Sequence, residues 1–76
     1  MNIKELDEEY IAGTYSRFPV EIVKGEGSVV FDENGKRYID LGSGIAANVF
    51  GYGDREWIDA VTQQLSKVQH TSNLYY

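Results

Sequence analysis

Apolar residues near the start of the chain recur at helical spacing. The stripe within the segment IKELDEEYIA consists of Ile3, Leu6, Tyr10 and Ile11. This spacing predicts a short amphipathic helix over residues 3–12, ended by Gly13. A helix of that length is barely stable alone, so we expect its apolar stripe to dock on another part of the protein.

The middle of the chain changes to the alternation that is typical of strands. Arg17-Phe18-Pro19 interrupts any helix, because proline disfavours the α conformation for the residue before it. Glycine-containing turns at Gly25-Glu26-Gly27 and at Asn34-Gly35 then separate apolar runs, and Asn-Gly favours a type I′ hairpin turn. The pattern predicts a three-stranded antiparallel meander with strands over residues 20–24, 28–32 and 37–41.

Helical spacing returns after the glycines at 51 and 53. The apolar stripe there consists of Trp57, Ile58, Val61, Leu65 and Val68. Asp54 is a suitable N-cap, so we predict an amphipathic helix over residues 54–69, with Trp57 in the core. Two helices and a meander together predict an α+β fold for residues 1–76.

The last residues of the chain are Leu74-Tyr75-Tyr76. Because domains usually end in exposed polar residues, we expect the natural polypeptide to continue beyond Tyr76. A single domain of 76 residues would in any case be marginal in stability, and the chain has no cysteine to form a disulfide.

Charge narrows the choice of partners. Twelve acidic against seven basic residues leave a net charge of -5, with no basic stripe for nucleic acid. No apolar stretch is long enough to span a membrane, and the polar N-terminus does not resemble a signal peptide. With one histidine and no cysteine we expect no metal site. The absence of cysteine is compatible with a cytoplasmic location.

The stretch DLGSGIAA from Asp40 to Ala47 satisfies the loose pattern G-x-G-x-x-G/A of nucleotide-binding loops. Its context argues against that function, because a hairpin strand precedes it and further glycines follow before a long helix could begin. We interpret it as a loop whose glycines permit a close approach of ligand or backbone. A small nucleotide binder is therefore the least favoured of three functional hypotheses.

No complete catalytic arrangement is visible in these residues. His70 could act as a base or ligand, but a charge-stabilising position at a helix C-terminus is the simpler interpretation. Ser43, Thr71 and Ser72 carry hydroxyl groups, yet one histidine does not establish a catalytic triad. Tyr15, beside the proline break, is either an anchor for the first helix or a ligand contact.

Several blocks in order carry a resemblance to a known family. They are Phe18-Pro19-Val20 before the Gly-x-Gly turn, the hairpin from Phe31 to Asp40, SGIAAN from Ser43 to Asn48, and HTSNLY from His70 to Tyr75. Together they resemble the N-terminal part of the class III, fold-type I aminotransferases, which depend on pyridoxal phosphate. Within that family they are most similar to the acetylornithine branch. One departure is Gly51-Tyr52-Gly53-Asp54-Arg55, where the family commonly has G-H-C-H-P, which weakens the choice of branch.

The resemblance implies a reaction and a set of contacts. The whole enzyme would transfer the δ-amino group of N-acetylornithine to 2-oxoglutarate, in arginine biosynthesis. Tyr15 matches a tyrosine that contacts substrate, and Ile45 matches a position that shapes the substrate pocket. Ser43 and Gly44 flank Ile45, so we expect all four residues to bind the amino-acid substrate.

The resemblance also implies what this chain lacks. The family's Schiff-base lysine, its aspartate for the pyridine nitrogen and its phosphate-binding loop match no residue here, so we expect no catalytic or cofactor-binding residue. The 76 residues alone would then be inactive, whereas the whole enzyme would bind pyridoxal phosphate and form a homodimer. The principal rival is a free-standing α+β module that binds a partner protein, or another copy of itself, through an exposed apolar patch.

Overall fold

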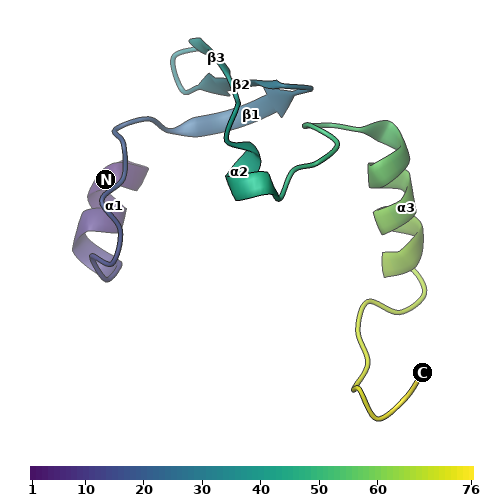
Figure 1. Ribbon diagram of the computed structural model, residues 1–76. Helices are drawn as coiled ribbons and strands as arrows, with labels where there is room; N and C mark the ends of the chain where they lie inside the picture. The colour runs from purple at the N-terminus through teal and green to yellow at the C-terminus, as the bar shows by residue number, and fades with distance from the viewer.

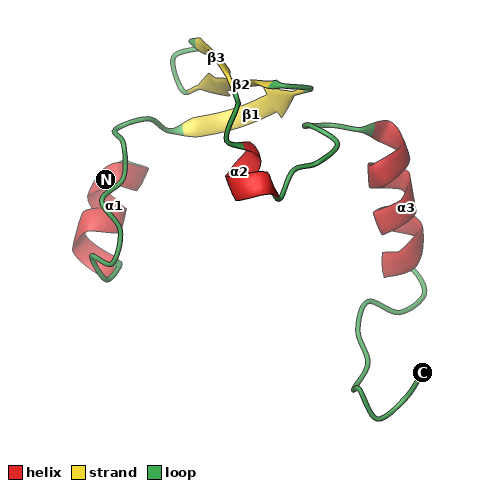
Figure 2. Cartoon of the chain, viewed as in Figure 1, coloured by secondary structure: helices red, strands yellow, loops and turns green.

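The computed structural model describes residues 1–76 and consists of one sheet with helical segments on either side (Figure 1). Figure 2 shows the alternation of helix, strand and loop along the chain. This arrangement confirms the predicted α+β class. The elements are α1 (Ile3–Tyr10), β1 (Ile22–Glu26), β2 (Val29–Asp32), β3 (Arg37–Ile39), α2 (Ser43–Ala46) and α3 (Arg55–Leu65).

The sheet is the predicted antiparallel meander, with strand order β1-β2-β3. Val30 on the central strand pairs with Gly25 of β1 and with Tyr38 of β3. The only two buried residues of the chain, Val30 and Asp32, both belong to β2. What core exists is therefore centred on the middle strand.

The first turn lies later than the glycine pattern predicts. Gly25 and Glu26 belong to β1, and the chain reverses at Gly27, whose φ is +58°. Gly25 is needed for a different reason, because a Cβ atom there would lie 2.7 Å from Cβ of Tyr52. The glycine lets the ring of Tyr52 lie against the strand.

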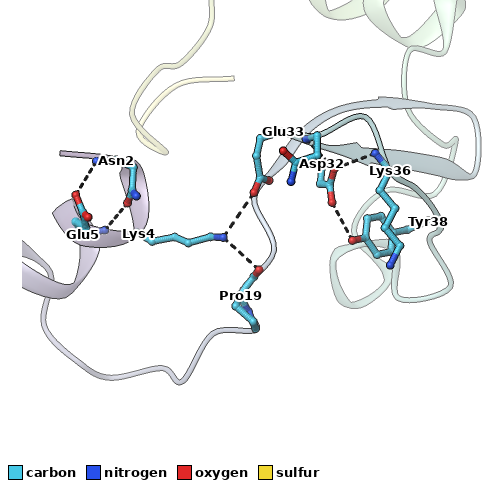
Figure 3. A network of polar contacts seen from close by, with 9 residues as sticks. Asn2, Lys4, Glu5, Pro19, Asp32, Glu33, Lys36 and Tyr38 are labelled. Atoms are coloured by element: carbon cyan, nitrogen blue, oxygen red, sulfur yellow. Dashed lines mark hydrogen bonds and ion pairs between the residues drawn. The ribbon is translucent and has the colours of Figure 1, made fainter.

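The second turn lies where Asn34-Gly35 predicts it, but its type differs. A type I′ turn needs positive φ at both residues, whereas only Gly35 has one, at +81°. One carboxylate oxygen of Asp32 accepts the backbone N–H groups of Asn34 and Lys36, each at 2.9 Å. Its other oxygen accepts the hydroxyl group of Tyr38 at 2.9 Å (Figure 3). The aspartate, rather than an Asn-Gly pair in left-handed conformation, holds this turn.

The first helix is shorter than its apolar pattern. Asn2 and Glu5 form a reciprocal capping box at its start, and Ile11 turns extended, so the helix ends at Tyr10 rather than at residue 12. Instead of docking by its apolar stripe, α1 is held by polar contacts of Lys4 and by an ion pair between Asp7 and Arg17 at 3.1 Å. The ammonium group of Lys4 lies 3.2 Å from the carbonyl oxygen of Pro19 and 3.6 Å from Glu33 (Figure 3).

The last helix begins as predicted and ends early. The carboxylate of Asp54 accepts the backbone N–H of Trp57 at 2.9 Å. The helix ends at Leu65, and the C-cap residue Ser66 bonds to carbonyl oxygens of the last turn through its N–H and hydroxyl groups. Trp57 is 54% exposed, so the predicted core position is wrong for this chain.

The elements form an open arrangement. The Cα radius of gyration is 16.6 Å, whereas a compact chain of this length would have about 11 Å. Strands contact their neighbours in the sheet, but no helix packs on the sheet or on another helix. None of the helices has the length and apolar character needed to cross a membrane. The apolar faces of α1 and α3 are thus left uncovered within these 76 residues.

Candidate functional site

Asp40 organises the glycine-rich loop that follows β3. Its Oδ1 atom accepts the backbone N–H of Gly42 at 3.0 Å and that of Ser43 at 2.8 Å. Its Oδ2 atom accepts the hydroxyl group of Tyr52 at 2.5 Å. One carboxylate therefore holds the start of the loop with one oxygen and its far end with the other.

Tyr52 is fixed in turn by the sheet. Its backbone N–H and C=O groups pair with those of Gly27, both at 2.9 Å. Gly51 before it has a φ of +76°, and a Cβ atom there would lie 2.8 Å from the carbonyl oxygen of Gly27. Only glycine at position 51 allows the two backbones to approach this closely.

The loop contains a helical turn of unusual hand. In α2 the φ angles are positive at four consecutive residues, Ser43, Gly44, Ile45 and Ala46, with values between 45° and 63°. For the three that are not glycine, this conformation costs about 1–2 kcal/mol each. A β-branched residue such as Ile45 is especially rare there. Such local strain is typical of functional sites, so the turn is a candidate site on physical grounds.

The turn exposes its strained apolar side chain. Ile45 is 97% exposed, so within this chain no burial offsets the cost of its backbone conformation. The backbone N–H of Ile45 donates to the carbonyl oxygen of Gly42 at 2.8 Å, and that of Ala47 to Ser43 at 2.9 Å. The turn is internally bonded and presents Ile45 outward.

The Asp40–Tyr52 contact changes the ionisation of both groups. The hydrogen bond from Tyr52, helped by the backbone N–H groups of Ser43 and Gly42, holds the pKa of Asp40 below its ordinary value. The same hydrogen bond, with partial burial and the charge of Asp40, raises the pKa of Tyr52. At neutral pH the pair is therefore a carboxylate facing a neutral phenol.

An open groove lies beside this pair. It has a volume of ≈ 610 Å³ and is mostly apolar. Asp40, Gly44 and Tyr52 line one part of it, and Phe18 and Val20 line another. Arg17 is the one cationic residue in the lining, and its guanidinium group pairs with Asp7 at 3.1 Å.

The structure brings together only some of the residues that the sequence predicts to bind substrate. Ser43, Gly44 and Ile45 lie together in α2, and of these Gly44 lines the groove. Tyr15 lines a second pocket, of ≈ 530 Å³, which shares Arg17 and other residues with the first. A substrate contact at each of these four residues stays a prediction.

His70, Thr71 and Ser72 do not line the groove. His70 was expected at a helix C-terminus, but α3 ends at Leu65 and His70 makes no hydrogen bond. The interpretation of His70 as a capping residue is therefore wrong. Thr71 and Ser72 lie in the same exposed stretch, away from the groove.

The sequence pattern does not identify Asp40 and Tyr52 as partners. It predicts Asp40 at the end of a strand and Tyr52 in a glycine-rich connection. One signal could have suggested them: an aspartate directly before Leu41-Gly42-Ser43 can accept the N–H groups of the following turn. Nothing local indicates that a tyrosine twelve positions later would take the other oxygen.

Comparison with known proteins gives a consistent result. The profile of the family "Aminotransferase class-III" matches residues 10–76. The chain is 47% identical over 74 residues to the acetylornithine aminotransferase of Haemophilus ducreyi, covering 97% of this chain and 19% of that protein. It is 49% identical over 76 residues to the acetylornithine aminotransferase of Methanopyrus kandleri, covering 100% and 20%.

Comparison with solved structures agrees with the sequence comparison. Acetylornithine aminotransferase from Elizabethkingia anophelis superposes with a TM-score of 0.86 at 36% identity, over 96% of this chain and 19% of that one. Ornithine aminotransferase from Toxoplasma gondii superposes with a TM-score of 0.86 at 29% identity, over 96% and 17%. The chain thus spans about a fifth of the length of the relatives it matches.

Proposed function

Because the chain belongs to the class III aminotransferase family, we propose that it serves a pyridoxal phosphate-dependent transamination. The whole enzyme transfers the δ-amino group of N-acetylornithine to 2-oxoglutarate and yields N-acetylglutamate semialdehyde and glutamate, in arginine biosynthesis. The observation that carries this proposal is 47% identity over nearly the whole chain to a protein named acetylornithine aminotransferase.

The chain's part in the reaction is to shape the substrate pocket. The left-handed turn α2 presents Ile45 towards the donor, and Ser43 and Gly44 let the ligand approach the backbone. Tyr15, at the neighbouring pocket, contacts the same substrate. The strain in α2 supports this role, because a backbone that is unfavourable for folding is retained where function requires it.

We propose that the cofactor is held by residues outside this chain. Lys24 and Lys36 place their ammonium groups over aromatic rings, at 4.8 Å and 5.1 Å from the centroids. Lys4 is engaged by Glu33 and Pro19, and Lys67, beyond the end of α3, does not line the groove. The groove offers no cation except Arg17, which is paired with an acid. We therefore assign no residue of this chain to the cofactor, and we place its lysine and phosphate contacts elsewhere in the whole enzyme.

Assembly and location complete the proposal. The open arrangement of the chain, with the apolar faces of α1 and α3 uncovered, supports its packing against further protein. We propose that the whole enzyme is a homodimer in the cytoplasm. Light scattering of the purified enzyme tests the dimer. A monomer at micromolar concentration contradicts it.

The deciding experiment assays the protein encoded by the complete reading frame. We expect kcat/KM for N-acetylornithine with 2-oxoglutarate to exceed that for ornithine. A preference for ornithine would move the enzyme to the branch represented by the Toxoplasma gondii structure. Absence of transamination with either donor, in protein that carries the cofactor absorbance, would overturn the proposed function.

A control isolates the contribution of the 76 residues. The chain alone, incubated with pyridoxal phosphate, should show neither transamination nor the absorbance of a lysine-bound cofactor after dialysis. A retained, lysine-borne absorbance would contradict the assignment of the cofactor site to other residues.

A further inference from the structure

The left-handed turn α2 needs a restraint from outside itself. Its internal hydrogen bonds join Gly42 to Ile45 and Ser43 to Ala47. Such bonds form in a turn of either hand, and L-residues prefer the right-handed one. The contacts that select the strained hand must therefore come from residues outside the turn.

The loop over residues 40–52 is tied to the sheet at both ends. The backbone N–H of Asp40 donates to the carbonyl oxygen of Ser28 at 2.8 Å. Tyr52 pairs with Gly27 in both directions at 2.9 Å. Both ends are thus anchored on two adjacent residues of the turn between β1 and β2. The loop leaves the sheet and returns to the same point.

The side chains of the two anchor residues close the loop. The carboxylate of Asp40 joins the hydroxyl group of Tyr52 at 2.5 Å and holds the N–H groups of Gly42 and Ser43, directly at the entry of α2. Asn48, after the turn, also reaches the hydroxyl group of Tyr52, at 3.4 Å. The same hydroxyl group therefore touches the chain before and after α2.

We propose that Asp40 and Tyr52 are positioning residues, which lock α2 in its left-handed form and so fix Ile45 against the amino-acid substrate. This rests on the proposed function, in which Ser43, Gly44 and Ile45 contact the donor. Because Asp40, Gly44 and Tyr52 line one groove, loosening the pair also changes the shape of that groove. Neither residue takes part in bond making.

The test uses the complete enzyme with Asp40→Asn and Tyr52→Phe. Tyr52→Phe removes only the hydroxyl group and keeps the ring against Gly25. The matched control is Asp32→Asn, since Asp32 also accepts two backbone N–H groups and a tyrosine hydroxyl but holds a different turn and does not itself line the groove, although its partner Tyr38 does. All variants are compared at equal cofactor absorbance and equal folded fraction.

We expect both loop variants to lower kcat/KM for N-acetylornithine by about 10- to 100-fold, because a misplaced contact near the reacting geometry has effects of that size. The control should stay within about twofold. Discrimination between N-acetylornithine and ornithine should fall in the loop variants only. An equal loss in the control, or unchanged kinetics in both loop variants, would overturn the proposal.

Hydrogen exchange provides a readout that does not depend on activity. Backbone amides of residues 45–48 should exchange faster in both loop variants and at the wild-type rate in the control. Unchanged exchange in the loop variants would overturn the positioning role even where kinetics change. If the wild-type enzyme does not act on N-acetylornithine, the proposed function fails, and the exchange data alone decide whether the pair locks the turn.

Discussion

Two aspartates of this chain make the same three contacts in two different places. Asp32 accepts two backbone N–H groups of a hairpin and the hydroxyl group of Tyr38. Asp40 accepts two backbone N–H groups of a loop and the hydroxyl group of Tyr52. We call these the hairpin clamp and the loop clamp.

The backbones that they hold differ. The hairpin needs one positive φ, which Gly35 supplies without strain. The loop carries positive φ at Ser43, Ile45 and Ala46, none of which favours it. The same chemistry therefore stabilises a relaxed turn in one place and a strained turn in the other. Only the strained turn requires anchors on another element, and it is the one that presents a candidate substrate contact.

The largest difference in unfolding free energy between the two regions should appear when a methyl group is added to one glycine in each. In Gly51→Ala the new Cβ atom would lie 2.8 Å from the carbonyl oxygen of Gly27, at a φ of +76°. We expect a loss of more than about 2 kcal/mol, since backbone strain and a backbone clash add. Chemical unfolding of the complete enzyme measures it.

The matched hairpin variant is Gly35→Ala. Its φ is +81°, but nothing lies within 4 Å of the added Cβ atom. It should cost about 1 kcal/mol from the backbone alone and leave kcat/KM near the wild-type value. Equal losses of stability in the two variants would show that the bridge between Gly27 and Tyr52 is unimportant.

This contrast also shows how far sequence reasoning reaches. The meander and the start of α3 follow from local patterns, namely alternation in the strands and an aspartate N-cap at Asp54. The hairpin turn was located by Asn34-Gly35, although Asp32 rather than Asn34 decides its type.

What sequence reasoning missed depends on contacts between distant residues. Gly25 looked like a turn residue, yet it is a glycine because the ring of Tyr52 lies against it. The strained α2 was not predicted as a helical turn at all, because serine, isoleucine and alanine have no local reason to take a positive φ. The candidate site therefore lies where local preference and observed structure disagree.

Acid should weaken both clamps. Hydrogen bonds hold the pKa of Asp40 below 3.8. For Asp32, burial raises the pKa, but the hydrogen bonds from Lys36, Tyr38 and Asn34 together outweigh it, so its pKa is also lowered. A lowered pKa stabilises the fold above the unfolded value, and this stabilisation is lost as pH falls through the folded pKa.

The raised pKa of Tyr52 has the opposite effect on how stability depends on pH. Its contribution to stability is present below its ordinary pKa of 10.0 and is lost as pH rises through the folded pKa.

Thermal unfolding of wild type, Asp32→Asn and Asp40→Asn between about pH 2 and pH 7 measures the loss of stability in acid. Each variant should be less stable than wild type at neutral pH, and the difference should shrink in acid. A constant difference would contradict the linkage.

A smaller effect, in the opposite direction, should follow from relaxing the strained turn. Ile45→Gly removes a β-branched residue from a φ of +60°, at a position that is 97% exposed in this chain. We expect the free energy of unfolding to stay equal or rise by about 1 kcal/mol while kcat/KM falls, since strain at a functional position favours activity over stability. Val23→Gly, on β1 with an exposed side chain outside the groove, is the control and should only destabilise.

The smallest effect should come from a carboxylate next to the hairpin clamp that has no backbone contacts. Glu33 forms an ion pair with Lys4 at 3.6 Å, and both side chains are partly exposed. Glu33→Gln should change stability by about 0.5 kcal/mol or less, because solvent and side-chain entropy offset most of such a pair. The difference should disappear in about 1 M salt, where screening is nearly complete. A change as large as that of Asp32→Asn would mean that charge near the hairpin, rather than the bonds from Asp32 to the turn and to Tyr38, accounts for the clamp.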